Sequence, residues 1–196
     1  MSEILATLLT ASGLGLSAGL NAYATLLVFG LLARFYPSWV PGEGAELFAS
    51  TPMLILLAVL YAVEFFADKF PAIDHAWDAI HTFIRPLAGA IVAFASAKPG
   101  LSAGLVIAAT ILGGSAALGG HAAKSTLRVT STATTGGTMN PLLSVAEDLF
   151  AILQSIVAIL LPYLMAVILV LIVIPLAIVL AILVRRRRDA PAPAGR

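Results

Sequence analysis

The chain has 196 residues, of which 60% are hydrophobic and 11% are charged, and its formal net charge is +1. Soluble domains are about 25% charged, so this composition excludes an ordinary soluble domain and indicates a surface that faces lipid. The balanced charge argues against nucleic acid, and the lack of cysteine excludes disulfides and thiolate metal sites. We predict an all-α transmembrane bundle over residues 1–188 and a disordered tail at residues 189–196.

The first apolar segment, Ile4 to Arg34, is longer than one membrane span, which takes about 20 residues. A polar loop is predicted from Phe35 to Thr51, where Trp39 suits the aromatic belt of a membrane interface. The second predicted span runs from Pro52 to Asp68.

The stretch from Ala72 to Arg85 has a different pattern, because its apolar and polar residues fall on opposite sides of a helix. This pattern predicts an amphipathic helix that lies along the interface or lines a polar cavity, with its polar residues on one accessible face. A short apolar helix, Pro86 to Ala97, is expected to follow as a marginal span. The polar residues are Asp74, Asp78, His81 and Arg85.

The second half of the chain begins with a predicted span from Leu101 to Leu118. The segment from Gly119 to Asn140 is rich in Ser, Thr and Gly and is expected to be a polar loop. Pro141 to Leu183 is long enough for two spans, with a break near Pro162. The total is about six spans.

The basic residues indicate how six spans would be oriented. With the carboxyl terminus inside, nine basic residues fall on the cytoplasmic side, and only Arg34 and Lys98 fall outside. Cytoplasmic loops carry an excess of Lys and Arg, so both termini are predicted to be cytoplasmic. The nine are Lys69, Arg85, Lys124, Arg128, Arg185 to Arg188 and Arg196.

An internal similarity relates the two halves, residues 4–97 and 100–184. The hexapeptide Gly-Leu-Ser-Ala-Gly-Leu occurs at residues 15–20 and 100–105, and a rival alignment at an offset of 100 pairs Gly19 with Gly119. Either alignment relates the first span to the fourth, which run in opposite directions in a six-span topology. A 3+3 inverted repeat, common in secondary transporters, would explain this. Chance similarity among small and apolar residues is the alternative.

Charged residues inside apolar segments are the candidate functional residues, because each costs about 2.5–3.5 kcal/mol to insert and needs a partner or a function. Lys124 and Arg128 lie one helical turn apart and could neutralise Glu64 or Glu147. One interpretation is a structural network of ion pairs, and the other is a site for an ion or an anionic group. The candidate site consists of Glu64, Asp68, His121, Lys124, Arg128, Glu147 and Asp148.

Other motifs are less specific. The hydroxyls that follow Lys124 suit a phosphate or carboxylate, although an ordinary cytoplasmic loop has the same composition. A glycine pair, Gly15-x-x-x-Gly19, is typical of closely packed helices. A solvated polar face explains the weak metal candidates as well as a metal would, so we predict neither a metal nor another cofactor, and no catalytic motif indicates an enzyme. These weak candidates are Asp74, Asp78 and His81.

Three motifs together resemble the bacterial membrane-protein family called domain of unknown function 4126. They are Gly19-Leu-Asn-Ala-Tyr-Ala-Thr25, Glu64-Phe-Phe-Ala-Asp-Lys-Phe-Pro71, and Gly120-His-Ala-Ala-Lys-Ser-Thr-Leu-Arg128 continuing to Asn140-Pro141. The resemblance covers nearly all of residues 10–160. It implies a small multi-spanning protein of the bacterial cytoplasmic membrane, with no activity or catalytic residue to transfer.

These observations favour a small transporter or channel, whose expected partners are membrane lipid, a small anionic solute or ion, and further copies of the chain. The alternative is a non-transporting scaffold or a subunit of another membrane protein, and a lipid-modifying enzyme comes third. The distinguishing observation is whether the candidate charges line a water-filled cavity or are dry and paired.

Overall fold

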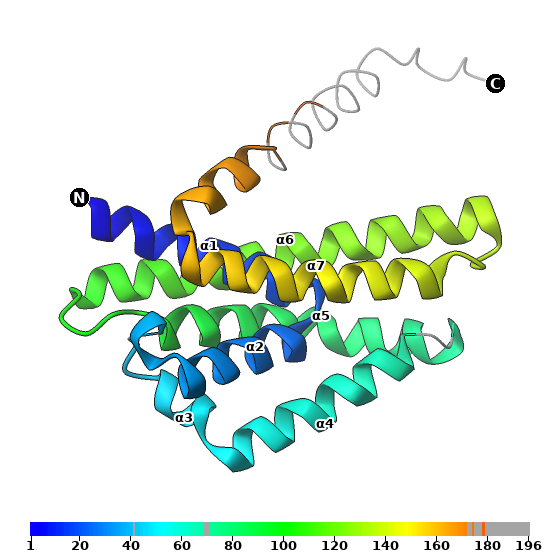
Figure 1. Cartoon of the computed structure of the whole chain (residues 1–196). Helices are drawn as coiled ribbons and strands as arrows, with labels where there is room; N and C mark the ends of the chain where they lie inside the picture. Colours follow the sequence, from blue (N-terminus) through cyan, green and yellow to red (C-terminus); the bar gives the residue numbers. More distant parts are fainter. Residues whose placement is uncertain (41, 69–70, 172–173, 175–177, 179–196) are drawn as a thin grey trace.

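The computed structural model describes residues 1–40, 42–68, 71–171, 174 and 178, with the side chains of residues 71–78 excepted. The predicted tail and the basic run Arg185 to Arg188 lie outside this part. The described residues form helices and turns with no strand, which confirms the all-α prediction. Figure 1 shows α1 (Ser2–Leu20), α2 (Ala22–Phe35), η1 (Pro37–Trp39), α3 (Ala45–Ala49), α4 (Thr51–Ala67), α5 (Pro71–Ala95), α6 (Ala103–Thr135) and α7 (Asn140–Leu160).

The first apolar segment, predicted to be longer than one span, is a hairpin of two helices. The chain reverses at Asn21, whose extended backbone (φ −145°, ψ 108°) ends α1 and begins α2. The Asn21 side chain caps α2 by accepting a hydrogen bond from the backbone N–H of Ala24 at 2.8 Å. The tip of this hairpin lies inside the bundle, beside α7 (Figure 1).

The hairpin brings the amino terminus to the same end of the bundle as the predicted external loop. Thr7, Ser38, Lys98 and Pro162 line one pocket of about 170 Å³ there. The junctions between α4 and α5 and between α6 and α7 lie at the opposite end (Figure 1). The amino terminus and this loop thus lie at one end of the bundle, because the reversal at Asn21 adds one change of direction, and their sides of the membrane stay a prediction.

Helix α5 is continuous through Pro86, and joins the predicted amphipathic helix to the predicted short span. Its amphipathic pattern is confirmed where side chains are described, but the polar side faces inward. His81 and Arg85 are fully buried, whereas Ile80 is 54% and Phe83 is 75% exposed. The prediction of an accessible polar face is therefore wrong for these two residues, and the side chains of Asp74 and Asp78 lie outside the described residues.

The predicted polar loop at Gly119 to Asn140 is helical as far as Thr135, because α6 continues through it. Its threonines are compatible with a helix since their hydroxyls donate to the preceding turn, as Thr130 Oγ1 does to the Thr126 carbonyl at 2.9 Å. The helix ends at Gly136, whose φ of +64° suits the left-handed C-cap conformation that glycine adopts without strain.

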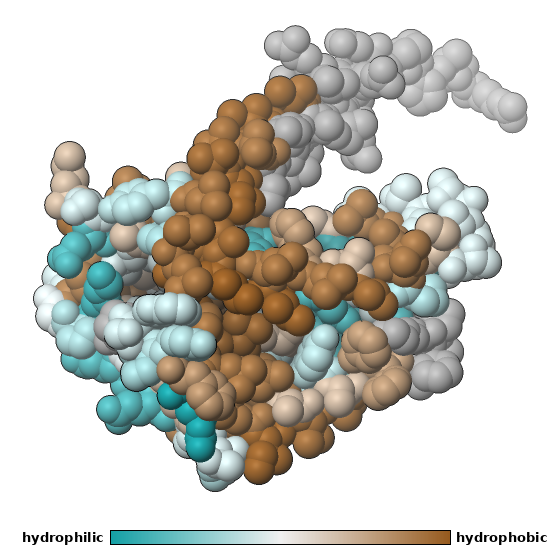
Figure 2. Space-filling model, viewed as in Figure 1, coloured by the Kyte–Doolittle hydropathy of each residue, from teal (hydrophilic) through white to brown (hydrophobic). Residues whose placement is uncertain are grey.

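Three described helices, α1, α6 and α7, are long and apolar enough to cross a membrane. Shorter apolar helices include α2, α4 and Pro162–Leu171, and the last confirms the predicted break near Pro162. Polar residues gather at the two ends of the visible face, and apolar residues cover its middle (Figure 2). The count of six spans stays a prediction, since the hairpin replaces one expected span with two helices.

Helices α1 and α6 pack at backbone contact, which confirms the predicted role of Gly15 and Gly19. A Cβ atom on Gly15 would lie 2.2 Å from the Gly113 carbonyl oxygen, and one on Gly19 would lie 2.2 Å from that of Ala117. From Gly15 to Gly19 on α1, the contacted residue moves forward from Gly113 to Ala117 on α6. The two helices therefore run in the same direction. The predicted inverted relation between these segments is wrong, because it requires opposite directions.

Candidate functional site: a buried charge cluster

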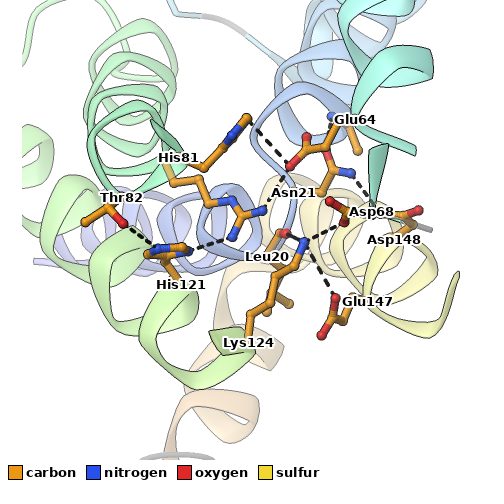
Figure 3. Close-up of polar contacts among 12 residues, drawn as sticks. Leu20, Asn21, Glu64, Asp68, His81, Thr82, His121, Lys124, Glu147 and Asp148 are labelled. Atoms are coloured by element: carbon orange, nitrogen blue, oxygen red, sulfur yellow. Dashed lines mark hydrogen bonds and ion pairs between the residues drawn. The ribbon is translucent and has the colours of Figure 1, made fainter. Parts of the chain in front are cut away.

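The seven candidate residues predicted from the sequence lie together at the tip of the α1–α2 hairpin (Figure 3). They come from the end of α4, the middle of α6 and the first turns of α7, and residues of α5 complete the group. We call this group the charge cluster. Its described members are Asn21, Glu64, Asp68, His81, Arg85, His121, Lys124, Arg128, Glu147 and Asp148, all of them buried.

Glu64 and Arg85 form the first part of the cluster. Arg85 Nη2 donates to Glu64 Oε1 at 3.0 Å, and both side chains have no exposed area. Arg85 Nη1 lies 2.6 Å from His121 Nδ1. A guanidinium can only donate, so Nδ1 accepts, and the proton of the neutral imidazole is on Nε2, from which it is donated to Thr82 Oγ1 at 3.0 Å. His81 Nε2 lies 3.8 Å from Glu64 Oε1.

The second part is built on two cations of α6. Lys124 Nζ donates to Asp68 Oδ2 at 2.8 Å and to the carbonyl oxygen of Leu20 at 3.2 Å, and lies 3.6 Å from Glu147 Oε2. Arg128 Nη2 is 2.9 Å from both Asp68 Oδ2 and Glu147 Oε2. The predicted neutralisation of Glu147 is thus present, but Asp68 takes the place expected for Glu64.

Asp148 has a different environment from the other carboxylates. Its Oδ1 accepts a hydrogen bond from Asn21 Nδ2 at 2.8 Å, and its residue is 3% exposed. No ion pair of Asp148 is present in the described part of the chain. The Asn21 amide has a defined orientation, because its oxygen is already bound to the Ala24 N–H. The hairpin tip therefore presents a donor to this carboxylate.

The described part of the charge cluster has more carboxylate oxygens than its Lys and Arg side chains donate hydrogen bonds to. It has four carboxylates and three Lys or Arg side chains, and one oxygen of each carboxylate has no hydrogen-bond partner among the described residues. Lys124 and Arg128 already donate to carboxylates, and the carboxylate oxygens without a partner are the surplus acceptors of the described cluster. The oxygens are Glu64 Oε2, Asp68 Oδ1, Glu147 Oε1 and Asp148 Oδ2.

Sequence reasoning did not place Asn21, Thr82 or Arg85 in the candidate site. Arg85 was assigned to an accessible face because a polar stripe on a helix normally faces water. A strongly apolar opposite face, with Phe83 and Ile84 directly before Arg85, was the available signal that the stripe faces inward in lipid. Of the weak metal candidates, His81 lies beside Glu64, and the described residues contain no group of three His, Asp or Glu that could hold a metal.

Comparison with known proteins places the chain in a family. No curated protein and no solved structure matches the chain. A family model described as Domain of unknown function (DUF4126) matches residues 8–182. That range contains all the helices from α2 to α7 and every described residue of the charge cluster. The chain belongs to the DUF4126 family.

Proposed function

We propose that the chain is an integral membrane protein that carries a small cation across the cytoplasmic membrane, with the charge cluster as its binding site. The observation that supports this most is the helix break at Asn21. At this break the Leu20 carbonyl, the last of α1, and the Asn21 side-chain amide both face the charge cluster, which has carboxylate oxygens without a hydrogen-bond partner among the described residues. Interrupted helices whose ends meet an ion site at membrane depth are a recurring device of secondary transporters.

The distribution of residues supports a membrane location. Glu64, Arg85 and Lys124 are buried, whereas large apolar side chains such as Ile55, Val59 and Phe83 are exposed. This arrangement is unfavourable in water and favourable in a lipid bilayer. Lipid tails solvate the exposed apolar side chains, and charged side chains in a bilayer must find partners inside the protein. The contrast is strongest on α4, whose exposed face is apolar and whose last turns carry Glu64.

The shape of the chain supports a revised orientation. The amino terminus shares one end of the bundle with Lys98 and Trp39. From this end α4, α5, α6 and α7 run alternately across the bundle, so Lys124 and Arg128, in the second half of α6, lie toward the opposite end. Basic residues favour the cytoplasm. We therefore place the amino terminus outside, and the carboxyl terminus, which lies beyond the described residues, keeps its predicted position inside.

Cysteine labelling tests this orientation in a chain that has no cysteine of its own. Ser2→Cys and Glu46→Cys should both react with a membrane-impermeant thiol reagent added to intact cells. Thr138→Cys, in the turn between α6 and α7, should react only after the membrane is opened. Reaction of Ser2→Cys and Thr138→Cys from the same side would contradict the orientation.

A cation fits the cluster better than the small anionic solute expected from the sequence. An anion needs donors that are free to turn toward it, but Lys124 lies within hydrogen-bond distance of Asp68 and Leu20, and Arg128 is bound to Asp68 and Glu147. A cation needs oxygen ligands, which the unpartnered carboxylate oxygens supply.

The alternative function, a non-transporting scaffold, is favoured by the short ion pairs. Hydrogen bonds of 2.8–2.9 Å among Lys124, Arg128, Asp68 and Glu147 also suit a network that only holds the helices together. Ion flux in liposomes separates the two functions. The purified protein should move Na⁺, K⁺ or H⁺ at least tenfold faster than empty liposomes, measured with ion-sensitive dyes under a concentration gradient of the ion being tested.

A paired variant identifies the cluster as the site. Asp68→Asn combined with Lys124→Met removes one charge of each sign, so the net charge of the bundle is unchanged. We expect the flux to fall to the level of empty liposomes while the protein stays monodisperse in detergent. Gly119→Ala, at an open position on α6, is the matched control and should retain the flux. No flux from the wild type for any of the three ions would favour the scaffold.

A further inference from the structure

Among the residues that the structure describes, Asp148 is the carboxylate of the charge cluster that forms no ion pair. Glu64, Asp68 and Glu147 each pair with Lys or Arg at 3.0 Å or less. Asp148 is as deeply buried as these three, but its hydrogen bond comes from the neutral Asn21 amide, and its Oδ2 has no partner in the described part of the chain.

The charges around Asp148 do not neutralise it. Glu64 and Asp68 approach from α4, Lys124 from α6, and Glu147 is its neighbour on α7 (Figure 3). Lys124 is the cation of this group, and its Nζ is already shared between Asp68 and Glu147. A charged carboxylate without a partner is costly in a water-excluded interior, unless a cation pairs with it or it takes up a proton.

From this geometry we propose that Asp148 takes up and releases the transported ion, and that this ion is a proton. The inference rests on the proposed transport function and names its substrate. Uptake adds one proton to a carboxylate oxygen and cancels one buried negative charge, and release restores the carboxylate. One unpartnered oxygen, Oδ2, accommodates a proton, whereas a metal ion would need several oxygen ligands around it.

The hairpin tip is placed to respond to this proton. The oxygen of Asn21 is held by the Ala24 N–H, so its amide group can only donate to Asp148. A hydrogen bond to a charged carboxylate is about twice as strong as one to a neutral acid. Protonation therefore weakens the contact between the hairpin tip and α7, and deprotonation strengthens it. Asn21 is a positioning residue in this scheme, and Asp148 carries the ion.

Proton flux into liposomes tests the proposal with matched variants. A pH-sensitive dye inside the liposomes should report proton entry for the wild type under a potassium diffusion potential. Asp148→Asn, which is nearly isosteric, should reduce proton flux at least tenfold. Ser144→Ala removes a buried hydroxyl one turn earlier on α7 without changing a charge, and it should retain the wild-type rate.

The outcomes separate this inference from the proposed function. Flux of Na⁺ or K⁺ without proton flux, unchanged in Asp148→Asn, would overturn the proton inference and leave cation transport intact. No flux of any ion would overturn the transport function. Proton flux that Asp148→Asn retains would show that another group carries the proton.

Infrared spectroscopy gives a second readout that does not depend on transport. A buried protonated carboxyl group has a carbonyl stretching band distinct from that of a carboxylate. The wild type and Ser144→Ala should show this band grow as the pH is lowered, and Asp148→Asn should lack that component. A band that is unchanged in Asp148→Asn, or no such band in the wild type over the pH range in which it stays folded, would contradict the assignment.

Discussion

Helices α1 and α6 meet in two regions that differ in how they are stabilised. In the first, which we call the glycine seam, Gly15 and Gly19 bring α1 onto the backbone of α6 at Gly113 and Ala117. In the second, immediately beyond, the Leu20 carbonyl accepts a hydrogen bond from Lys124 within the charge cluster. One pair of helices thus changes from close packing to electrostatic contact within about one helical turn.

The difference shows what each region can tolerate. The glycine seam depends on the absence of side-chain volume, so it is sensitive to any added atom and insensitive to charge. The charge cluster depends on the balance of charges, so it is sensitive to the loss of one partner and less sensitive to the loss of both. A rigid seam beside a cluster with unpartnered oxygens would let the hairpin tip respond to an ion while α1 stays attached to α6.

The largest effect is expected in the glycine seam. Gly15→Ala places a Cβ atom 2.2 Å from the Gly113 carbonyl oxygen, and the two backbones must separate to accept it. We expect a loss of at least about 3 kcal/mol in the free energy of unfolding, at the upper end for overpacking. The measurement is the yield of monodisperse protein in detergent together with a denaturation curve in SDS. A variant as stable as the wild type would show that α1 and α6 are not in backbone contact.

An effect of similar size is expected in the charge cluster. Arg85→Met leaves Glu64 buried without its cation and should cost about 3–5 kcal/mol. Combining it with Glu64→Gln should recover most of this loss, because no charge is then left unpaired in that contact. The two single variants and the double variant form a thermodynamic cycle in SDS denaturation.

A comparison pair gives the control for that cycle. Glu64→Gln is not expected to rescue Arg128→Ala, because Arg128 bonds to Asp68 and Glu147 and not to Glu64. Equal rescue of Arg85→Met and Arg128→Ala by Glu64→Gln would mean that only net charge matters in this cluster.

A smaller effect is expected at the hairpin tip. Asn21→Ser keeps a residue that caps α2 well but is too short to donate to Asp148. Losing this charge-assisted hydrogen bond should cost about 1.5–3 kcal/mol. In Asp148→Asn the carboxylate is absent, so adding Asn21→Ser should cost much less. Additive losses in the double variant, measured by melting temperature in detergent, would show that the two residues are not coupled.

The smallest effect has the opposite sign. Gly119 lies on α6 with no atom within 4 Å of the position of an added Cβ, so alanine meets open space there. Gly119→Ala should stabilise the protein by about 0.5–1 kcal/mol, because alanine loses less backbone entropy in a helix. Comparing it with Gly15→Ala under the same denaturation conditions separates the intrinsic effect of glycine from its packing role.

Much of the candidate site could be predicted because charge is expensive in an apolar environment. Glu64, Lys124 and Glu147 stand out in segments that otherwise carry almost no charge, and such residues must find partners inside the bundle. The choice of partners could not be predicted in the same way. Arg85 and Glu64 are 21 residues apart and their contact depends on how α4 and α5 are placed side by side.

Two local sequence patterns led to wrong predictions, because the same pattern can occur in different surroundings in the fold. The Ser- and Thr-rich segment after Gly119 has the composition of a loop, but each hydroxyl that donates to its own helix removes the need for water. The polar stripe of α5 has the pattern of a surface helix, but His81 and Arg85 face the interior. Periodicity defines two faces of a helix and does not say which of them faces lipid.

By itself, the sequence determined that this protein is helical, that apolar surface dominates it, that Gly15 and Gly19 need a closely packed neighbour, and which charged residues must find partners inside the bundle. These properties follow from single residues and their spacing, because propensity, size and the cost of burying charge are local quantities. Only the tertiary structure decided that the chain reverses at Asn21, that α1 and α6 run in the same direction, and that Asp148 is the cluster carboxylate with no ion pair to a described residue. Those properties depend on which distant helices meet, and the free energy of such contacts belongs to pairs of residues rather than to either one.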